Sequence, residues 1–233
     1  MPVWRYGQAL RAADAVIFHN RDDLILLKKL GAIAQTQRVA VVPGAGVDVE
    51  HSQPLELPAL GQGLVFLMIA GLDRRRGVLE YAEAAAALRQ QAPTSRFLFA
   101  SLPDAGDIDP ASLAPGVEYV GEAAAHPDLL AQCHVFVYPA AVDGMPQPVL
   151  QAMAAGRPIV TSDVAGCRDT VDERVNGCLV PPRDVGALQA AMEGFLKRPD
   201  LIPSMARASR SKAERFCSTD SARRSMLDIL QLD

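Results

Sequence analysis

Two short stretches combine charged or polar side chains with the start of a predicted helix. The first, AGLDRRRGVLEYAEA (70–84), contains a strand end near Ala70, three consecutive arginines and a helix that begins around Gly77. A helix N-terminus offers unpaired N–H groups and partial positive charge, and arginine adds a fork of donors, so this arrangement suits a phosphate group. A solvated basic turn explains the same residues, and only the position of the stretch after a strand favours phosphate.

The second stretch, AVDGMPQPVLQAMAAGRP (141–158), carries a carboxylate and an amide eight residues apart, Asp143 and Gln151. Gly144 and Pro146 indicate a tight turn, and a second proline suits the first turn of the helix that follows, where its missing N–H has no intrahelical partner. Asp143 before the helix and Gln151 within it can then face one crevice. A turn residue and a helix-surface residue are the simpler interpretation, and spacing alone favours it.

Each of these loops follows a predicted strand. A third loop, in VVPGAGVD (41–48), contains Gly44 and Gly46, although such a glycine pair also serves a simple turn. Strands alternate with helices along almost the whole chain, which predicts an α/β fold with a parallel sheet, right-handed crossovers and helices on both faces. Ligands of such sheets bind beyond the carboxyl ends of the strands, near the switch in strand order. We therefore expect all three loops on one edge of the sheet.

Hydrophobic periodicity and helix-end signals locate the individual elements. Strands are expected at 14–20, 38–48 (ending in the glycine loop), 64–72, 96–101, 117–121, 134–139, 158–162 and 178–182. Helices are expected at 21–31, 77–91, 126–133, 147–155 and 184–197, with two more between 203 and 231.

Composition narrows the class of protein. The 233 residues are 49% hydrophobic and only 5% aromatic, which is typical of helix-covered parallel sheets, and the net charge of −4 argues against nucleic-acid binding. The four cysteines have no CxxC spacing, so we expect free thiols in a reducing compartment rather than disulfides or a metal site. The N-terminus lacks a signal-peptide core, and the longest apolar run, 63–72, is too short to span a bilayer. A cytoplasmic protein without a transmembrane segment is expected.

Four motifs in the same order resemble the C-terminal, donor-binding half of the GT-B glycosyltransferases, specifically the retaining family 4, or group 1. The family patterns are approximately PNGVD, GRLxxxKG, PSxxEGxPxxxLEAMAxGxPVVxTxxxG and NGxLVPPxDxxAL. This chain reads PGAGVD (43–48), AGLDRRRG (70–77), PAAVDGMPQPVLQAMAAGRPIVTSDVAG (139–166) and NGCLVPPRDVGAL (176–188). The segment TSDVAGCRDTV is similar to members that build bacterial surface polysaccharides and lipid-linked oligosaccharides.

The resemblance implies a Rossmann-like domain that binds a nucleoside diphosphate sugar as donor substrate, without a metal or other cofactor. It implies a catalytic role near the sugar for Asp143 and a ribose contact for Gln151, whereas the positions that hold the diphosphate correspond to Gly71 and Arg76. The full set of donor-binding positions that we carry over is Gly71, Arg75, Arg76, Gly77, Gly121, Glu122, Gly144, Met145, Pro146 and Gln151. Gly44 and Gly46 match the interdomain loop.

The chain departs from the family pattern at three of these positions. Gln151 replaces a glutamate but still accepts and donates hydrogen bonds, so ribose binding weakens without being abolished. Asp143 keeps the charge of the family's glutamate with one methylene less, which matters near a reacting centre. Gly71 replaces an arginine that would neutralise the leaving diphosphate, and Arg74 or Arg75 is the nearest substitute. The sequence therefore predicts an altered donor site.

The resemblance also suggests how the chain is divided. Residues 1–20 resemble the last helix and strand of the family's N-terminal, acceptor-binding domain, so we assign 1–35 to a remnant of that domain. The nucleotide-sugar-binding domain is assigned to 36–200 and the C-terminal helices to 201–233. Because a lone parallel strand leaves its backbone groups unpaired, strand 14–19 is expected to dock on the main domain, a partner chain or a second copy.

Three functions follow from the resemblance. The leading one is the donor-binding part of a retaining glycosyltransferase that acts on a saccharide or lipid-linked acceptor, the latter implying a peripheral position at the inner membrane face. The alternative is a non-catalytic nucleotide-sugar-binding or scaffold subunit that requires a separate partner chain or self-association. A phosphorylase is disfavoured because no lysine lies where a pyridoxal phosphate anchor is expected. We expect the chain alone to transfer no sugar.

Overall fold

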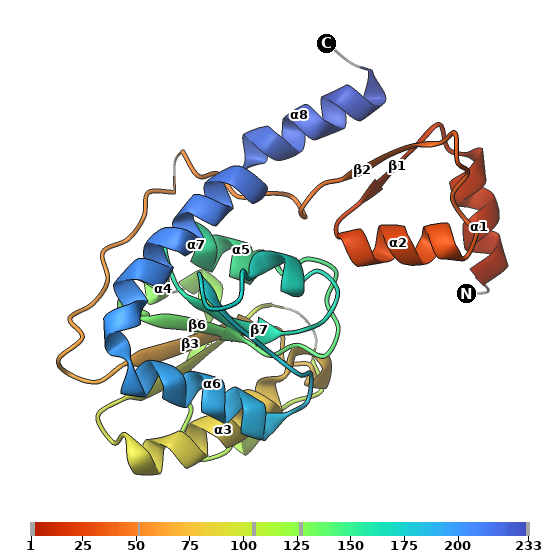
Figure 1. The fold of residues 1–233 in the computed structure, drawn as a ribbon. Coiled ribbons are helices and arrows are strands. Elements are labelled where there is room, and N and C mark those ends of the chain that lie inside the picture. The colour runs from red at the N-terminus through yellow and green to blue at the C-terminus, as the bar shows by residue number, and fades with distance from the viewer. Residues whose placement is uncertain (1–2, 51, 104–105, 126–127, 232–233) are drawn as a thin grey trace.

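The computed structural model describes residues 3–50, 52–103, 106–125 and 128–231. Within these residues the chain forms a large α/β unit and a small N-terminal unit, which lies to one side of the large one (Figure 1). The predicted fold class, a parallel sheet with helices on both faces, is confirmed. The first two residues of the predicted helix 126–133 lie outside the described residues, as do the extreme ends of the predicted domains at 1–2 and 232–233.

The large unit is built on a six-stranded, fully parallel sheet. Its spatial order is β5-β4-β3-β6-β7-β8. Chain order therefore runs outward in opposite directions from β3 and β6, and the switch point lies between these two strands. The strands are β3 (Val65–Ala70), β4 (Arg96–Ser101), β5 (Glu118–Glu122), β6 (Val135–Tyr138), β7 (Ile159–Ser162) and β8 (Gly177–Val180).

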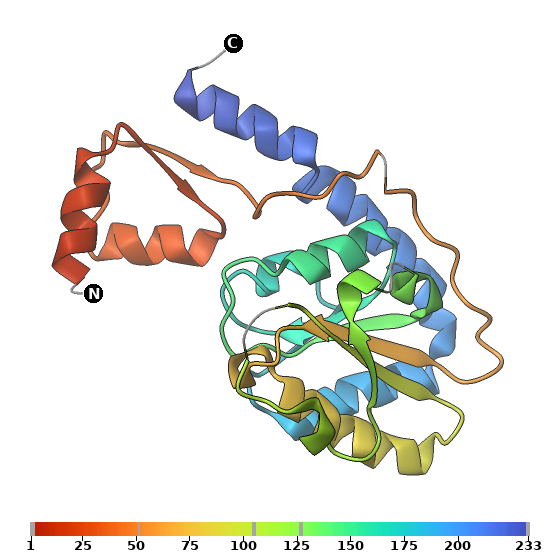
Figure 2. The same cartoon turned by 180° about the vertical axis from the view of Figure 1, so that it is seen from behind.

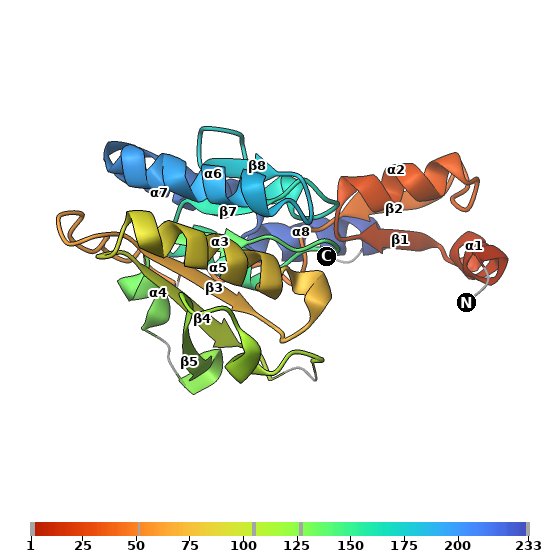
Figure 3. The same ribbon diagram turned by 90° about the horizontal axis from the view of Figure 1, so that it is seen from below.

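Helices cover the two faces of this sheet, as the views in Figures 1 and 3 show. On one face α3 packs against α6, and on the other α5 packs against α7, with α4 beside β3. This division follows from right-handed crossovers that lead in opposite directions from the switch point. The helices are α3 (Val78–Gln91), α4 (Leu129–Gln132), α5 (Gln147–Ala154), α6 (Val185–Lys197) and α7 (Ile202–Phe216).

The core extends over both faces of the sheet, and one part of it lies where α3 meets the central strands. The Phe66 and Phe97 rings stack with their centroids 5.2 Å apart. Tyr81 of α3 is fully buried, and its hydroxyl lies 3.1 Å from the Phe66 carbonyl oxygen and 3.2 Å from that of Leu98. The buried alanines of α3 let the helix lie close to the sheet. This packing fixes the position of the N-terminus of α3, which lies beside the carboxyl end of β3.

The N-terminal unit contains α1 (Val3–Ala12), β1 (Ala15–Phe18), α2 (Arg21–Lys29) and β2 (Arg38–Val41). The expectation that the first strand has no strand neighbour of its own is wrong, because β1 pairs in parallel with β2 over four residues. The boundary drawn from the sequence at residues 35 and 36 separates these paired strands. The last helix, α8 (Thr219–Leu230), returns to pack on β2 and β1 (Figure 2), and Arg38 donates to the Ile229 carbonyl oxygen at 2.9 Å.

The chain passes between the two units at two adjacent places. The Val47 N–H donates to the Cys217 carbonyl oxygen at 2.8 Å, and the Thr219 N–H donates to the Val47 carbonyl oxygen at 3.0 Å. Gly46 has φ +75°, and a Cβ there would lie 3.0 Å from the Thr219 Cα, so a glycine is needed at this crossing. The loop predicted between the domains, with Gly44 and Gly46, is part of the first crossing.

None of the helices within the described ranges is both long enough and apolar enough to cross a membrane.

Candidate active site

The candidate site lies between two loops at the switch point. One loop, 71–77, follows β3, and the other, 139–146, follows β6. Because the two strands are parallel neighbours, both loops lie at the same edge of the sheet. They also bond directly, since the Ala141 N–H donates to the Arg75 carbonyl oxygen at 2.8 Å. The structure thus places these two loops on one edge, as predicted, whereas the third predicted loop, with Gly44 and Gly46, follows β2 of the separate two-stranded sheet.

The first loop is shaped by an aspartate and a glycine. Asp73 caps the 3-10 turn η1 (Arg74–Arg76) by accepting from the Arg75 N–H at 2.8 Å, and its carboxylate also accepts from the Arg75 Nε at 2.9 Å. Gly77 then takes φ +79°, and a Cβ there would lie 2.1 Å from the Pro139 carbonyl oxygen. Only glycine fits this position, which brings the start of α3 against the second loop.

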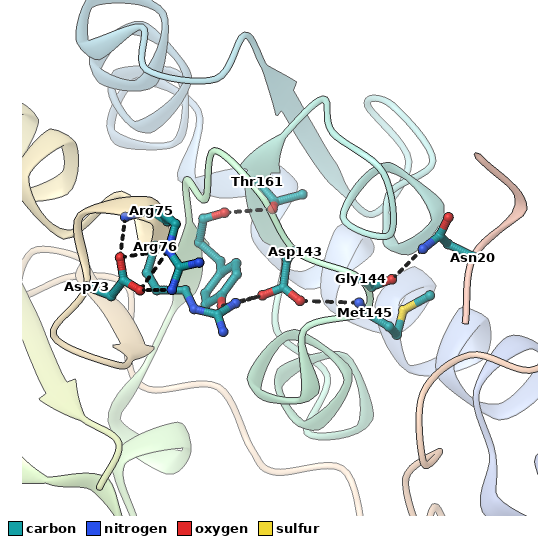
Figure 4. A network of polar contacts seen from close by, with 9 residues as sticks. Asn20, Asp73, Arg75, Arg76, Asp143, Gly144, Met145 and Thr161 are labelled. Carbon is teal, nitrogen blue, oxygen red and sulfur yellow. Dashed lines mark hydrogen bonds and ion pairs between the residues drawn. The ribbon is translucent and has the colours of Figure 1, made fainter. Parts of the chain in front are cut away.

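A charged cluster joins the two loops (Figure 4). The Asp143 Oδ2 accepts from the Arg76 guanidinium in an ion pair and from the Tyr138 hydroxyl at 2.7 Å, while Oδ1 accepts from the Met145 N–H at 3.2 Å. The Arg76 Nη1 also lies 3.2 Å from the Tyr138 oxygen. The Asp143 side chain is 11% exposed and that of Arg76 is 32% exposed, so the carboxylate is enclosed and part of the cation faces solvent.

Burial and charge set the protonation states in this cluster. Burial, with a further contribution from Asp143, raises the pKa of Tyr138 well above its ordinary value, so its hydroxyl stays protonated and donates to the carboxylate. Burial alone lowers the pKa of Arg76, but Tyr138 and Asp143 together raise it above the usual range. The cluster therefore presents a permanent cation next to a carboxylate that three donors hold in place.

The turn that carries Asp143 is packed on one side and open on the other. A Cβ at Gly166 would lie 2.1 Å from the Gly144 carbonyl oxygen, so the backbones of these two glycines are in direct contact. A Cβ at Gly144, in contrast, would meet no heavy atom within 4 Å. Pro146 is the residue before α5 and has an extended backbone, with φ −74°. The open space beside Gly144 adjoins the residue that carries the carboxylate.

Gln151 lies apart from this cluster. Its side chain is exposed on α5 and lines a hollow of about 530 Å³ together with Val47, Ser52 and Leu130. Neither Arg76 nor Asp143 lines the same hollow. The structure therefore does not bring Asp143, in the loop before α5, and Gln151, within α5, into one cavity.

Three further predicted donor-binding positions, Gly71, Gly121 and Glu122, make no contact with the charged cluster that the structure describes. Gly71 is buried, and its carbonyl oxygen accepts from the Asp73 N–H at 2.8 Å. Gly121 has φ +91° at an irregularity of the edge strand β5, and exposed Glu122 lies opposite Ser101. Because β4 and β3 separate β5 from β6, Gly121 and Glu122 do not join the charged cluster in this structure.

The two arginines proposed to substitute for the missing cation at position 71 are both paired with acids. Arg75 lies 2.5 Å from the Asp73 carboxylate, and Arg74 lies 3.2 Å from that of Asp107. Both arginine side chains are more than half exposed, at 71% for Arg75 and 66% for Arg74. Among the three consecutive arginines, Arg76 is the one whose guanidinium reaches the second loop.

Sequence reasoning missed two side chains that the structure places at the site. Tyr138 ends β6, and its backbone oxygen accepts from Thr161 at 2.7 Å, which fixes the strand end. Asn20 comes from the N-terminal unit and donates to the Gly144 carbonyl oxygen at 2.9 Å. Both are polar residues at the carboxyl end of a predicted strand, and that shared position was the available signal. Within the described parts of the chain, no cluster of three or more His, Cys, Asp or Glu side chains is arranged to hold a metal ion.

A doubly wound parallel sheet with a charged site at its switch point defines a Rossmann-like α/β domain. The match to known families is more specific. Residues 63–198, more than half of the chain, match the family described as glycosyl transferases group 1, and the chain belongs to that family. The family resemblance recognised in the sequence motifs is confirmed.

The curated relatives are longer than this chain. It is 25% identical over 228 residues to an N,N'-diacetylbacillosaminyl-diphospho-undecaprenol alpha-1,3-N-acetylgalactosaminyltransferase of Campylobacter jejuni, covering 91% of the chain and 58% of that relative. It is 26% identical over 195 residues to a UDP-Gal:alpha-D-GlcNAc-diphosphoundecaprenol alpha-1,3-galactosyltransferase of Escherichia coli, covering 76% of the chain and 49% of that protein. The chain thus spans half to three fifths of the length of these relatives.

Solved structures share the fold. Sucrose-phosphate synthase from Thermosynechococcus elongatus superposes with a TM-score of 0.81 at 21% identity, over 99% of this chain and 61% of that one. HepE from Anabaena, solved in complex with UDP-glucose, superposes with a TM-score of 0.78 at 16% identity, over 98% of this chain and 66% of that one. At these identities the likeness establishes the GT-B type of fold alone.

Proposed function

We propose that this chain is the donor-binding part of a retaining glycosyltransferase that takes a sugar from a nucleoside diphosphate sugar. The observation that carries the proposal is the Arg76–Asp143 pair, which joins the two loops at the switch point of a group 1 glycosyltransferase domain. The acceptor is a saccharide or a lipid-linked sugar, a class suggested by the names of the two diphosphoundecaprenol-dependent relatives.

The diphosphate is proposed to lie between the start of α3 and the turn 144–146. Arg76 is the cation there, partly exposed and next to a helix N-terminus, which is the environment that favours phosphate. The open side of Gly144 leaves room for a ligand beside the residue that carries the carboxylate. The nucleoside would then extend along α5, with its ribose toward Gln151 and the hollow that this side chain lines.

In this arrangement Arg76 acts on the leaving group. When the bond between the anomeric carbon and the diphosphate oxygen breaks, negative charge grows on the diphosphate, and a fixed guanidinium stabilises it. Asp143 is proposed to face the sugar. Because Arg76 already contacts Asp143, the proposed diphosphate and the carboxylate share one cation. We propose that binding needs no metal, which addition of a chelator would test.

A second function is favoured by specific departures from the family pattern. Gly71 supplies no cation, Arg74 and Arg75 are paired with acids, and Gln151 has no charge. These features suit a non-catalytic nucleotide-sugar-binding subunit that acts with a partner chain or a second copy. In either case the nucleotide-sugar donor points to a cytoplasmic location, and a lipid-linked acceptor to peripheral association with the inner membrane face.

Calorimetry with a panel of nucleoside diphosphates and their sugars tests the proposal. We expect one nucleotide to bind, and the Asp143→Ala variant to lose affinity for the nucleotide sugar more than for the bare diphosphate, because its proposed partner is the sugar. Because the chain alone is expected to transfer no sugar, product analysis with labelled donor and saccharide or lipid-linked acceptors is done in the presence of a partner chain that supplies an acceptor-binding domain. Product that is lost in the Asp143→Ala variant then identifies the transferase. If no nucleotide binds the folded chain, the donor-site proposal is wrong.

A further inference from the structure

One buried side chain of the N-terminal unit reaches the turn that carries Asp143. Asn20 lies two residues after the end of β1, is fully buried and caps the start of α2. Its Oδ1 accepts from the Asp23 N–H at 2.8 Å, and its Nδ2 donates to the Gly144 carbonyl oxygen at 2.9 Å and to an Asp23 carboxylate oxygen at 2.8 Å. These partners fix the orientation of the amide, since one is a donor and the other two only accept.

Capping alone does not require asparagine at this position. An oxygen from serine or aspartate serves equally well at a helix start, and Asp184 and Ser218 do so for α6 and α8. What asparagine adds is the amide N–H pair, and one of those bonds ends on the Gly144 carbonyl oxygen in the large unit. Figure 4 shows Asn20 and Asp143 on opposite sides of the Gly144–Met145 segment.

The geometry of one peptide group links the two side chains. The Gly144 carbonyl, which accepts from Asn20, and the Met145 N–H, which donates to the Asp143 Oδ1 at 3.2 Å, belong to the same planar peptide. Their C=O and N–H bonds point in opposite directions, so holding the oxygen on Asn20 directs the hydrogen toward Asp143. Gly166, whose backbone touches the same carbonyl, limits how far the peptide plane can shift.

We propose that Asn20 is a positioning residue for Asp143, acting through the Gly144–Met145 peptide. When Asn20 holds this peptide, the Asp143 carboxylate keeps its third donor and points its other oxygen at Arg76 and Tyr138. The consequence for sugar binding rests on the proposed function, because it requires that Asp143 contact the donor sugar. A residue outside the segment that matches the family thereby contributes to the site.

The test replaces Asn20 by residues that keep the cap but remove the amide donors, Asn20→Ser and the isosteric Asn20→Asp. We expect hydrogen exchange at the Met145 amide to accelerate by about fivefold or more, as for the loss of one ordinary hydrogen bond. We expect the dissociation constant for UDP-glucose to rise by about fivefold, while that for UDP changes less than about twofold. The Asp184→Ala variant, which loses a cap on α6, should change neither quantity.

The outcomes separate the inference from the function on which it rests. Unchanged exchange at Met145 in both folded Asn20 variants overturns the positioning role, and so does an equal loss of affinity for UDP and UDP-glucose. If the unaltered chain binds no nucleoside diphosphate, the proposed function fails, and the exchange of Met145 alone then decides whether Asn20 positions Asp143. Urea unfolding shows whether each Asn20 variant is folded. If one of the two does not fold, the other is used for the exchange and affinity measurements.

Discussion

Arg75 and Arg76 are consecutive in the sequence, yet their ion pairs differ in almost every respect. Arg75 pairs with Asp73, two residues away on the same loop, and its side chain is 71% exposed. Arg76 pairs with Asp143, 67 positions away on the neighbouring loop, and both side chains are at least two thirds covered. The first pair shapes its own turn, whereas the second joins two loops at the place where a ligand is proposed to bind.

The comparison shows that burial and sequence separation, rather than residue type, give an arginine its role. An exposed local pair contributes at most about 1 kcal/mol and is screened by salt. A covered pair costs more to break, because the remaining charge is left without a partner in a region that water reaches poorly. Four predictions test this difference, from the largest expected effect to the smallest.

The largest effect is expected where the two loops touch. Gly77→Ala would place a Cβ 2.1 Å from the Pro139 carbonyl oxygen at a residue with φ +79°, so the start of α3 must move away from the second loop. We expect urea unfolding to show a loss of about 3 kcal/mol or more. Gly144→Ala is the matched control, since its Cβ meets no atom within 4 Å. Equal stability of the two variants would contradict the contact.

Arg76→Ala and Arg75→Ala break the two pairs separately. If Arg76 holds the diphosphate, its loss should weaken binding of the nucleoside diphosphate by about 1.5–3 kcal/mol. Loss of the exposed Arg75, whose pair lies within its own turn, should leave the same affinity almost unchanged. Calorimetry on both variants checks this, with circular dichroism to confirm folding. Equal effects of the two substitutions would show that the long-range pair has no special role.

Gln151→Glu tests the proposed ribose end of the site, away from Arg76. The substitution restores the carboxylate of the family pattern, and a charge-assisted hydrogen bond to a ribose hydroxyl is stronger than a neutral one. We expect a modest gain in nucleotide affinity, about 1 kcal/mol. A nucleoside diphosphate with a 2′-deoxyribose is the control ligand, because removing a hydroxyl should reduce the gain. No change with either ligand would place the ribose away from α5.

The smallest effect concerns the exposed pair and pH. Hydrogen bonds from Arg75 lower the pKa of Asp73 from 3.8 to about 2. Because the folded-state pKa is the lower one, the stability contributed by the pair is present above pH 4 and is lost as the pH falls from about 4 through 2. NMR titration of the Asp73 carboxyl should give the lowered pKa, and Arg75→Ala should return it toward the ordinary value. An unchanged pKa in that variant would contradict the pairing.

The sequence was sufficient to predict the sheet and the loops that meet at its edge. Apolar runs such as 64–72 and the Ala-rich helix 77–91 have strong periodicity, and β3 and α3 lie within those ranges. The joining of Arg76 to Asp143 was not predicted, because pairing across 67 positions depends on the strand order. Asn20 was missed for the same reason, since its amide acts 124 positions away. The β1–β2 pairing was missed because a family-based boundary was drawn between them.

The two adjacent crossings between the units have a mechanical consequence. A single flexible connection would let one unit swivel freely about the other, but here the segments at Val47 and at 217–219 are fastened together by two hydrogen bonds. Two segments held side by side in this way bend about one line more readily than they twist. We therefore expect any opening that separates Asn20 from Gly144 to be a rotation about that line. Such a rotation of the small unit would move Asn20 relative to the turn that carries Asp143.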